Sequence, residues 1–299
     1  MIMIDLSRLT TEARNPKTMD LDEMSPLQIA EIMNNEDNNV VKGVHEVLPE
    51  IAKAIEKSTE AIAHGARIIY VGAGTSGRLG VMDAVECPPT FGVSYETVVG
   101  LMAGGENAFI KAAEGAEDHA EYGRDDLIKI HCRREDMVIG LAASGRTPYV
   151  IGALDYAKSI GCHTAAIACN KHSKVGEHAE IAIEPDNGPE VLTGSTRLKS
   201  GTSQKMILNM ISTGAMIGNG KVYQNLMVDV KQSNEKLITR AENIIMEATG
   251  CEREEAKKAR VDADGMVKTA IVMILLKCSR QEAEEKLKKA GGFIRRTLK

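Results

Sequence analysis

Four short apolar segments, each followed by a stretch with helical periodicity, constrain the fold of this 299-residue chain most strongly. They are Ile68 to Val71, Thr97 to Leu101, Met137 to Ala142 and Thr164 to Ala168. Strands that alternate with helices form βαβ units, in which the strands run parallel. Ile181 to Ile183 is a candidate fifth strand. The pattern predicts an α/β fold built on a parallel sheet, with ligands bound at the carboxyl ends of the strands.

The segments on either side of this alternation have a different character. Residues 1–25 are polar and irregular, and Ser25 is placed to cap a short helix that starts at Pro26. Apolar residues at helical spacing then predict one long amphipathic helix from about Val40 to His64. We therefore expect an N-terminal arm and long helix over residues 1–56.

The strand signals stop after residue 220. Four helices are predicted beyond it, over Asn234 to Ala248, Glu252 to Arg260, Gly265 to Lys277 and Arg280 to Lys289. The sequence thus predicts a sheet domain over residues 57–220 and a small helical domain over residues 221–299.

Composition excludes several classes of function. With 37 Lys and Arg against 42 Asp and Glu, and only nine aromatic residues, the chain lacks the basic surface and the stacking platforms of a nucleic-acid binder. The longest apolar runs, such as Ala270 to Leu276, are too short to span a membrane, and the N-terminus does not resemble an export signal. The six cysteines show no disulfide-type spacing. We expect a cytoplasmic protein with no nucleic-acid or membrane partner.

The loop after the first strand has the composition of an anion-binding turn. Gly72-Ala73-Gly74-Thr75-Ser76-Gly77 leaves a strand, opens a helix and matches the G-x-G-x-x-G pattern of dinucleotide-binding folds. Such folds also need an acidic residue at the end of the second strand, and here that strand ends Val98-Val99-Gly100-Leu101. Thr75 and Ser76 instead offer hydroxyl groups beside the N–H groups of a helix N-terminus. We predict that Thr75, Ser76 and Gly77 bind a phosphate monoester.

A second loop of this kind, Ser144-Gly145-Arg146-Thr147-Pro148, follows the third strand. Thr147 can cap the next helix, and Pro148 suits its first position. Either loop alone is equally well explained as a tight strand-to-helix turn. Two such loops on parallel strands can approach one phosphate from two sides, so we favour a shared site with contacts from Ser144, Gly145, Arg146 and Thr147.

A third polar cluster precedes the apolar helix predicted from about Leu198 to Ile217. Its members are Glu190, Ser195, Thr196, Arg197 and Lys199. Hydroxyl and guanidinium groups suit a sugar or a phosphate, whereas the alternative is a capped helix start. Glu190, Ser195 and Thr196 are our candidates for substrate contact.

These loops resemble those of the sugar isomerase (SIS) family, in which Ser and Thr after two strands hold a sugar phosphate. Longer blocks resemble the N-acetylmuramic acid 6-phosphate etherases of bacterial wall recycling. The blocks are Asp83-Ala84-Val85-Glu86-Cys87-Pro88-Pro89-Thr90, Ala113-Glu114-Gly115-Ala116-Glu117-Asp118 and Gly188-Pro189-Glu190-Val191-Leu192-Thr193-Gly194-Ser195-Thr196-Arg197-Leu198-Lys199. The resemblance runs from about Leu9 to Leu298. It implies a three-layer, flavodoxin-like SIS domain with a small C-terminal helical domain.

The resemblance also implies a reaction and its residues. Family members open the sugar ring, remove the proton α to the aldehyde, expel D-lactate from C3 and add water. By resemblance Glu86 is the acid that protonates the lactate oxygen, and Glu117 is the base at C2. Glu114 and Glu121 share the helical stretch predicted around Glu117, so the choice between Glu114 and Glu117 stays open. The family implies a homodimer with the site near the subunit interface, and the arm before Val40 is a candidate for that contact.

No metal or cofactor is expected. The reaction that the resemblance implies needs only a base and an acid. His172 and His178 are six residues apart and have no third ligand at metal spacing.

The acid role of Glu86 suggests a physical explanation that a structure can test. Cys87-Pro88-Pro89 should end the helix that begins near Gly77, which would place Glu86 at a helix C-terminus. The partial negative charge there disfavours ionisation of a carboxyl group. By the same reasoning, Glu117 and Asp118 precede a helix and are favoured as anions. A mid-helix, exposed Glu86 would overturn this explanation.

Two other functions compete with the etherase reaction. A sugar-phosphate isomerase of the same fold would bind a phosphosugar and use a carboxylate base, but it has no lactyl ether to cleave. A non-catalytic sugar-phosphate sensor, like glucokinase regulatory protein, would bind without turnover. That protein is built from two SIS domains, and this chain has room for one.

Overall fold

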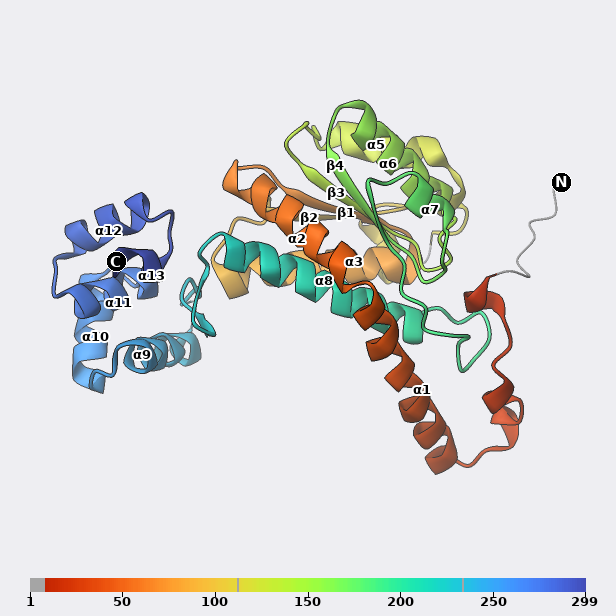
Figure 1. The fold of residues 1–299 in the computed structure, drawn as a ribbon, viewed down its shortest axis with the longest axis horizontal. Coiled ribbons are helices and arrows are strands. Elements are labelled where there is room, and N and C mark those ends of the chain that lie inside the picture. The colour runs from red at the N-terminus through yellow and green to blue at the C-terminus, as the bar shows by residue number, and fades with distance from the viewer. Residues whose placement is uncertain (1–8, 112, 233) are drawn as a thin grey trace. The chain divides into compact units, whose positions relative to one another are not determined.

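The computed structural model describes residues 9–111, 113–232 and 234–299 (Figure 1). Residues 1–8 of the predicted arm lie outside the described residues. The chain divides into two compact units, Met1–Ala84 with Glu96–Ser212, and Val85–Tyr95 with Thr213–Lys299. The sequence placed the boundary after residue 220. Helix α3 (Gly74–Phe91) runs from the first unit into the second after Ala84, and α8 (Lys199–Gly218) does so after Ser212.

The first unit contains all five predicted strands. They are β1 (Ile68–Gly72), β2 (Val98–Met102), β3 (Met137–Leu141), β4 (His163–Ile167) and β5 (Ile181–Ile183). They form a parallel sheet in the order β2-β1-β3-β4-β5, which is the flavodoxin-like order. The predicted α/β class and parallel sheet are confirmed.

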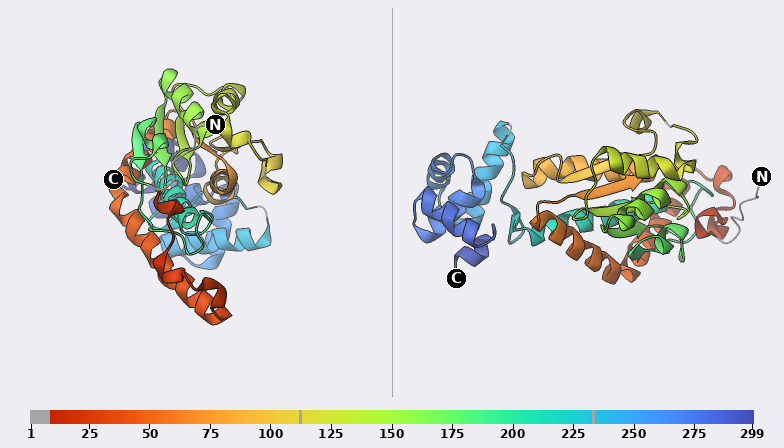
Figure 2. Two further views of the ribbon diagram at one scale, coloured as in Figure 1. Left: turned by 90° about the vertical axis from the view of Figure 1, so that its right-hand side faces the viewer. Right: turned by 90° about the horizontal axis from the view of Figure 1, so that it is seen from above.

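Helices cover both faces of this sheet (Figures 1 and 2). On one face α5 and α6 pack against Ile69, Val71 and Val138 in a buried aliphatic core. On the other face Tyr70 contacts α3. The α-helices that lie wholly in this unit are α1 (Pro26–Glu46), α2 (Leu48–Ala63), α4 (Asn107–Ile110), α5 (Ala120–Lys129), α6 (Pro148–Ser159) and α7 (Lys174–Glu177). The 3-10 turns are η1 (Thr10–Glu12), η2 (Pro16–Thr18), η3 (Leu21–Glu23) and η4 (Ala116–Asp118).

The prediction of one continuous helix over residues 40–64 is wrong. The chain forms two helices instead, because α1 continues from Pro26 to Glu46 and α2 starts at Leu48. Pro49 stands in the first turn of α2, where its missing N–H is tolerated and where a proline commonly begins a helix. The apolar periodicity runs through this junction, so it could not reveal the break. The predicted Ser25 cap is confirmed, since its side chain accepts from the Gln28 N–H.

The helix that carries Glu86 also differs from the prediction. It starts at Gly74 and continues through Pro88 and Pro89 to Phe91. Beyond the prolines, the Gly92 N–H still donates to the Pro88 carbonyl at 3.0 Å, so the helical bonding resumes at once. The two prolines therefore belong to the last turn and do not end the helix at Cys87.

The second unit is mostly helical, with a short hairpin that the sequence did not predict. The hairpin pairs β6 (Val222–Tyr223) with β7 (Leu226–Met227), and Gln224 at its turn has φ of 55°. The four predicted helices are present as α9 (Glu235–Thr249), α10 (Arg253–Asp262), α11 (Val267–Leu276) and α12 (Arg280–Lys289), and a short α13 (Ile294–Thr297) follows. Aliphatic side chains of these helices form a separate core.

Candidate functional site

The strand order brings the two predicted phosphate loops to neighbouring positions. Strands β1 and β3 are hydrogen-bonded neighbours, and Gly72 at the end of β1 is in register with Leu141 at the end of β3. Between them the order reverses, and such a switch point is where parallel α/β sheets bind ligands. The loop at 73–77 and the loop at 142–147 therefore leave the sheet side by side.

The first loop is tight because two glycines allow a close approach of backbone to backbone. A Cβ on Gly72 would lie 2.8 Å from the Gly77 nitrogen, and one on Gly77 would lie 2.8 Å from the Gly72 oxygen. Helix α3 starts at Gly74, so Thr75 and Ser76 occupy its first turn. Thr75 is half-buried, and Ser76 is only 6% exposed. This geometry sets two hydroxyl groups among the N-terminal N–H groups of a helix.

The second loop ends in the helix start that the sequence predicted. Pro148 is the first residue of α6 and Thr147 is its N-cap residue, but the Thr147 side chain makes no capping hydrogen bond. Gly145 has φ of 74°, and a Cβ there would collide with Ser173. Ser144, Arg146 and Thr147 are half-buried. The Thr147 hydroxyl is thus not committed to its own helix.

The third cluster is organised around Glu190, which is 1% exposed. Its Oε2 accepts from the Lys199 N–H at 2.9 Å, and its Oε1 accepts from the N–H and hydroxyl of Ser200 at 2.9 and 2.8 Å. Glu190 therefore caps α8 from outside the helix, which is the alternative that the sequence left open. Ser195 and Thr196 lie half-buried in the turn between Glu190 and α8.

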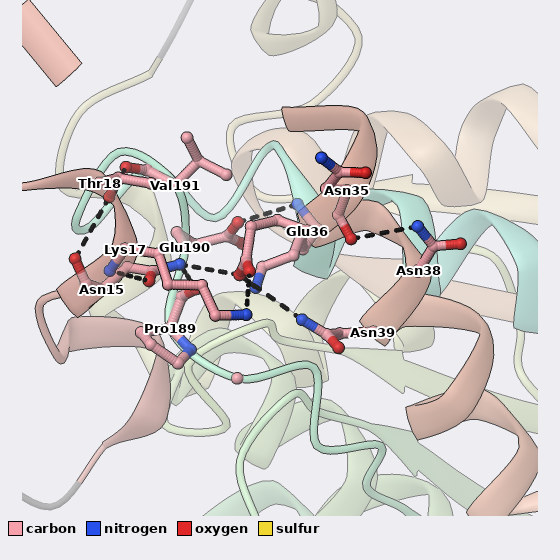
Figure 3. Close-up of polar contacts among 12 residues, drawn as sticks. Asn15, Lys17, Thr18, Asn35, Glu36, Asn38, Asn39, Pro189, Glu190 and Val191 are labelled. Carbon is pink, nitrogen blue, oxygen red and sulfur yellow. Dashed lines mark hydrogen bonds and ion pairs between the residues drawn. The ribbon is translucent and has the colours of Figure 1, made fainter. Parts of the chain in front are cut away.

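A buried ion pair supports the same segment (Figure 3). The Lys199 Nζ lies 3.0 Å from Oε2 of Glu36 on α1, and Lys17 of the arm lies 2.8 Å from Oε1. The Asn15 amide also donates to Oε2 at 2.8 Å. Burial alone would raise the pKa of Glu36, but hydrogen bonds from Lys17, Lys199 and Asn15 outweigh it and lower the pKa to about 2.

The described part of the arm contacts the segment around Glu190 directly and is linked to the second loop through Asn170. The Asn15 amide donates to the Pro189 carbonyl, and the Thr18 hydroxyl donates to the Val191 carbonyl at 2.8 Å. Thr11 pairs with Asn170, which follows β4 and donates to the carbonyls of Ala143 and Ser144. Residues 11–18 thus connect the second loop to the segment that carries Ser195 and Thr196.

A buried carboxyl group fixes α3 to the sheet. Asp83 accepts from the Tyr70 hydroxyl of β1 at 2.9 Å and from the Ser212 hydroxyl of α8 at 3.1 Å. Burial raises the pKa of Asp83, and these two hydrogen bonds oppose the rise only in part. Asp83 therefore has a structural role in holding the helix that begins with the first loop.

The two predicted catalytic carboxylates are both exposed. Glu86 lies inside α3, in the part that belongs to the second unit, five residues before the helix ends. The expected helix C-terminus at Glu86 is therefore absent, and the explanation built on it is wrong. Glu117 lies in η4 of the first unit, just before α5. Gly115, with φ of 76°, separates Glu114 from that turn, and Glu121 lies in α5. Glu114, Glu117 and Glu121 therefore do not share one helix as predicted.

The sequence did not single out Glu36, Asn170 or Gln204. Glu36 stands in the polar run Asn34-Asn35-Glu36-Asp37-Asn38-Asn39, which reads as a solvated helix face. Gln204 lies within the first two turns of α8 and accepts from the Ser76 hydroxyl at 2.8 Å. Its position near the first loop is set by the packing of α8, and no local pattern signals it.

Within residues 9–111, 113–232 and 234–299, no group of three or more His, Cys, Asp or Glu side chains could hold a metal ion. No helix in the same ranges is long and apolar enough to span a bilayer.

Known proteins resemble this chain in parts and along its whole length. The family model of the glucokinase regulatory protein N-terminal SIS domain matches residues 50–158, and that of the SIS domain matches residues 114–213. A phosphoheptose isomerase from Francisella tularensis has a similar fold, with a TM-score of 0.50 and 13% identity over 65% of this chain and 100% of that one.

The full-length relatives are far more similar. The N-acetylmuramic acid 6-phosphate etherase of Cronobacter sakazakii is 57% identical over 99% of both chains. That of Geobacillus sp. is 56% identical over 98% of this chain and 99% of its own. With this identity along its length and an SIS-type sheet carrying both Ser/Thr loops, the chain belongs to the N-acetylmuramic acid 6-phosphate etherase family.

Proposed function

We propose that this chain cleaves the D-lactyl ether of N-acetylmuramic acid 6-phosphate, with water, to N-acetylglucosamine 6-phosphate and D-lactate. The observation that carries the proposal is the 57% identity to a named etherase over 99% of both chains. An etherase of this kind is a carbon–oxygen lyase. The geometry of the two Ser/Thr loops suits the phosphate of such a substrate.

In this proposal the phosphate binds between the starts of α3 and α6. Thr75, Ser76 and Gly77 meet it from the first loop. Ser144, Gly145, Arg146 and Thr147 meet it from the second, since both loops leave adjacent strands. Two helix N-termini that point at one anion stabilise its charge through their N–H groups and dipoles. Ser195 and Thr196 contact the sugar, and Glu190 positions them through its cap on α8.

The chemistry then needs one base and one acid. Glu117 removes the C2 proton of the open-chain aldehyde, and the electron pair forms a C2–C3 double bond as the C3–oxygen bond breaks. Glu86 gives its proton to the departing lactate oxygen. Water next adds to C3 and gives a proton to Glu86, while Glu117 returns its proton to C2, which yields the amino sugar without any net oxidation and restores both carboxyl groups. Both carboxylates are exposed to solvent in this chain.

Single substitutions separate the two roles. Glu86→Gln should abolish lactate release but keep solvent deuterium exchange at C2 of the product, because the base is intact. Glu117→Gln should abolish both. Glu114→Gln is the matched control and should keep both activities. If Glu114→Gln loses exchange and Glu117→Gln keeps it, the base is Glu114 instead. If Glu86→Gln loses both lactate release and deuterium exchange, Glu86 cannot act solely as the acid.

The same lactate measurement tests the etherase function itself. Purified chain with N-acetylmuramic acid 6-phosphate should release one D-lactate per N-acetylglucosamine 6-phosphate formed. Aldose–ketose conversion without lactate would establish an isomerase instead. Stable binding of the phosphosugar without turnover would establish a sensor.

We further propose that the chain works in the cytoplasm as a homodimer. Support comes from the family resemblance and from exposed apolar side chains on α1, where Leu27 is 68% and Val41 is 59% exposed. Light scattering on the purified protein should give twice the 32.3 kDa chain mass. Leu27→Glu with Val41→Glu should shift it to the monomer. A monomeric wild-type protein would contradict the proposal.

A further inference from the structure

The environment of Ser76 contains a polar group that the phosphate-binding proposal does not use. The side chain of Gln204 is fully buried, and its Oε1 accepts the Ser76 hydroxyl proton at 2.8 Å. Its Nε2 is buried without a hydrogen-bond partner among the described residues. Since Nε2 and Oε1 are bonded to the same carbon, the unpaired N–H group lies next to Ser76 as well.

This arrangement is unsuitable for holding an anion. A serine hydroxyl has one proton to donate, and Ser76 gives it to Gln204. To any other group the Ser76 hydroxyl then offers only lone pairs, whereas phosphate oxygens need donors. The Ser76 hydroxyl oxygen in this state would repel the phosphate that the first loop is proposed to bind.

Turning the Gln204 amide by 180° removes the conflict. Nε2 would then donate to the Ser76 oxygen, and the Ser76 hydroxyl would be free to donate to a phosphate oxygen. Before the turn both N–H groups of Nε2 lack a partner, and after it one of them donates to Ser76. The carbonyl is then unpaired, and unpaired buried carbonyls are better tolerated than unpaired N–H groups. It also adds a charge-assisted hydrogen bond to the phosphate, which is stronger than a neutral one.

We propose that Gln204 is a positioning residue for the substrate phosphate, and that its side-chain amide turns over on binding so that Ser76 becomes a phosphate donor. The inference rests on the proposed phosphate site at Ser76. Helix α8 then contributes to that site twice, through the turn with Ser195 and Thr196 at its start and through Gln204.

Substitutions at Gln204 separate positioning from packing. At neutral pH, Gln204→Glu puts a carboxylate, which can only accept hydrogen bonds, in place of the amide. The Ser76 hydroxyl must then keep donating to residue 204, and a negative charge is added near the phosphate. We expect the KM for N-acetylmuramic acid 6-phosphate to rise at least tenfold, with kcat changed much less. Gln204→Met is the matched control, because it fills the same space but takes no proton from Ser76. Its KM should rise less than that of Gln204→Glu.

The pH dependence of KM gives a readout that a packing role would not produce. As pH falls, the carboxylate introduced by Gln204→Glu becomes protonated and can donate to Ser76, so the KM of this variant relative to wild type should recover. The KM ratio of Gln204→Met should stay flat. Thermal unfolding of each variant verifies that the fold is retained, and inorganic phosphate as a competitive inhibitor should follow the same ranking. A KM of Gln204→Glu equal to that of Gln204→Met at every pH would overturn the proposal.

Ser76→Ala distinguishes failure of this inference from failure of the phosphate site. If Ser76→Ala leaves KM and phosphate inhibition unchanged, Ser76 does not bind phosphate and both proposals fail. If Ser76→Ala weakens binding but Gln204→Glu does not, only the role of Gln204 fails. Because Gln204 is proposed to act through Ser76, the Gln204→Glu substitution should add less to KM in the Ser76→Ala background than in wild type. If the two substitutions raise KM independently, the proposal that Gln204 acts through Ser76 is contradicted.

Discussion

The Lys199 ammonium lies 3.0 Å from a carboxylate oxygen of Glu36, although 163 residues separate them in the chain. Lys199 is 0% and Glu36 3% exposed, so neither charge is stabilised by bulk water. The pair joins α1 to the first residue of α8, next to the turn with Ser195 and Thr196. The strength of this ion pair therefore determines how firmly the turn with Ser195 and Thr196 is held in place.

The first prediction concerns removal of either charge. Glu36→Gln leaves the Lys199 ammonium buried without a counter-charge, which should cost about 3–5 kcal/mol of unfolding free energy. Lys199→Met should cost less, about 1–3 kcal/mol, because Glu36 keeps Lys17 and Asn15. The double variant should be more stable than Glu36→Gln alone. Urea unfolding monitored by circular dichroism gives the order of stability, and a double variant less stable than Glu36→Gln would refute the prediction.

The second prediction follows from the low pKa of Glu36. Its folded-state pKa of about 2 lies below the ordinary 4.5, so the folded protein holds the carboxylate more readily than the unfolded chain. This stabilisation is complete above about pH 4.5 and is lost as pH falls toward 2. It amounts to about 3 kcal/mol. Urea unfolding between pH 6 and pH 2.5 should show a smaller pH dependence for Glu36→Gln than for wild type. Glu60→Gln, at an exposed surface pair with Lys57, is the control and should leave the slope nearly unchanged.

The third prediction uses the uncommitted hydroxyl of Thr147. Thr147→Val keeps the shape of the side chain and removes no capping bond, so the free energy of unfolding should change by less than about 0.5 kcal/mol. The KM for the phosphosugar should nevertheless rise about ten- to a hundredfold, the usual loss for a hydrogen bond to a charged group. The matched N-cap control is Ser279→Ala, where the hydroxyl does cap α12. It should lose about 1 kcal/mol with an unchanged KM. An unchanged KM for Thr147→Val would remove Thr147 from the site.

The fourth prediction concerns the close approach of Gly72 and Gly77. Gly72→Ala should push the start of α3 away from β1, because its Cβ would lie 2.8 Å from the Gly77 nitrogen. We expect a loss of about 1–3 kcal/mol together with a higher KM for the phosphosugar. Gly65→Ala is the control, since it has φ of 69° and open space around it. It should lose about 1 kcal/mol with no change in KM, and an equal KM in both variants would contradict the proposed site.

Local pattern predicted what depends on neighbours in the sequence. The five strands, the Ser25 cap and the start of α6 at Pro148 follow from short-range rules, and they were predicted correctly. The break between α1 and α2 was missed because the apolar spacing continues across it. The helix around Glu86 was misjudged because two prolines fit within a final helical turn.

The polar connections could not be predicted for a different reason. Glu190 reaches nine residues ahead to cap α8, and Ser76 meets Gln204 across 128 residues. The contacts of Glu36 and Asn170 likewise depend on the packing of distant segments. A polar run on a helix looks the same in sequence whether it faces water or a buried lysine, so only the tertiary arrangement distinguishes the two.

The contacts of the arm impose an order on folding during synthesis. Thr11 bonds to Asn170, and Asn15 bonds to Pro189, so these partners are made 159 and 174 residues later. At a translation rate of about 5–20 residues per second, the arm emerges from the ribosome roughly 10–40 s before its binding surface exists. During that time β1 to β4 can pair without it. The arm therefore docks only after β1 to β4 have been made, and the turn with Ser195 and Thr196 cannot be fixed before Lys199, about two-thirds of the way along the chain, has been synthesised.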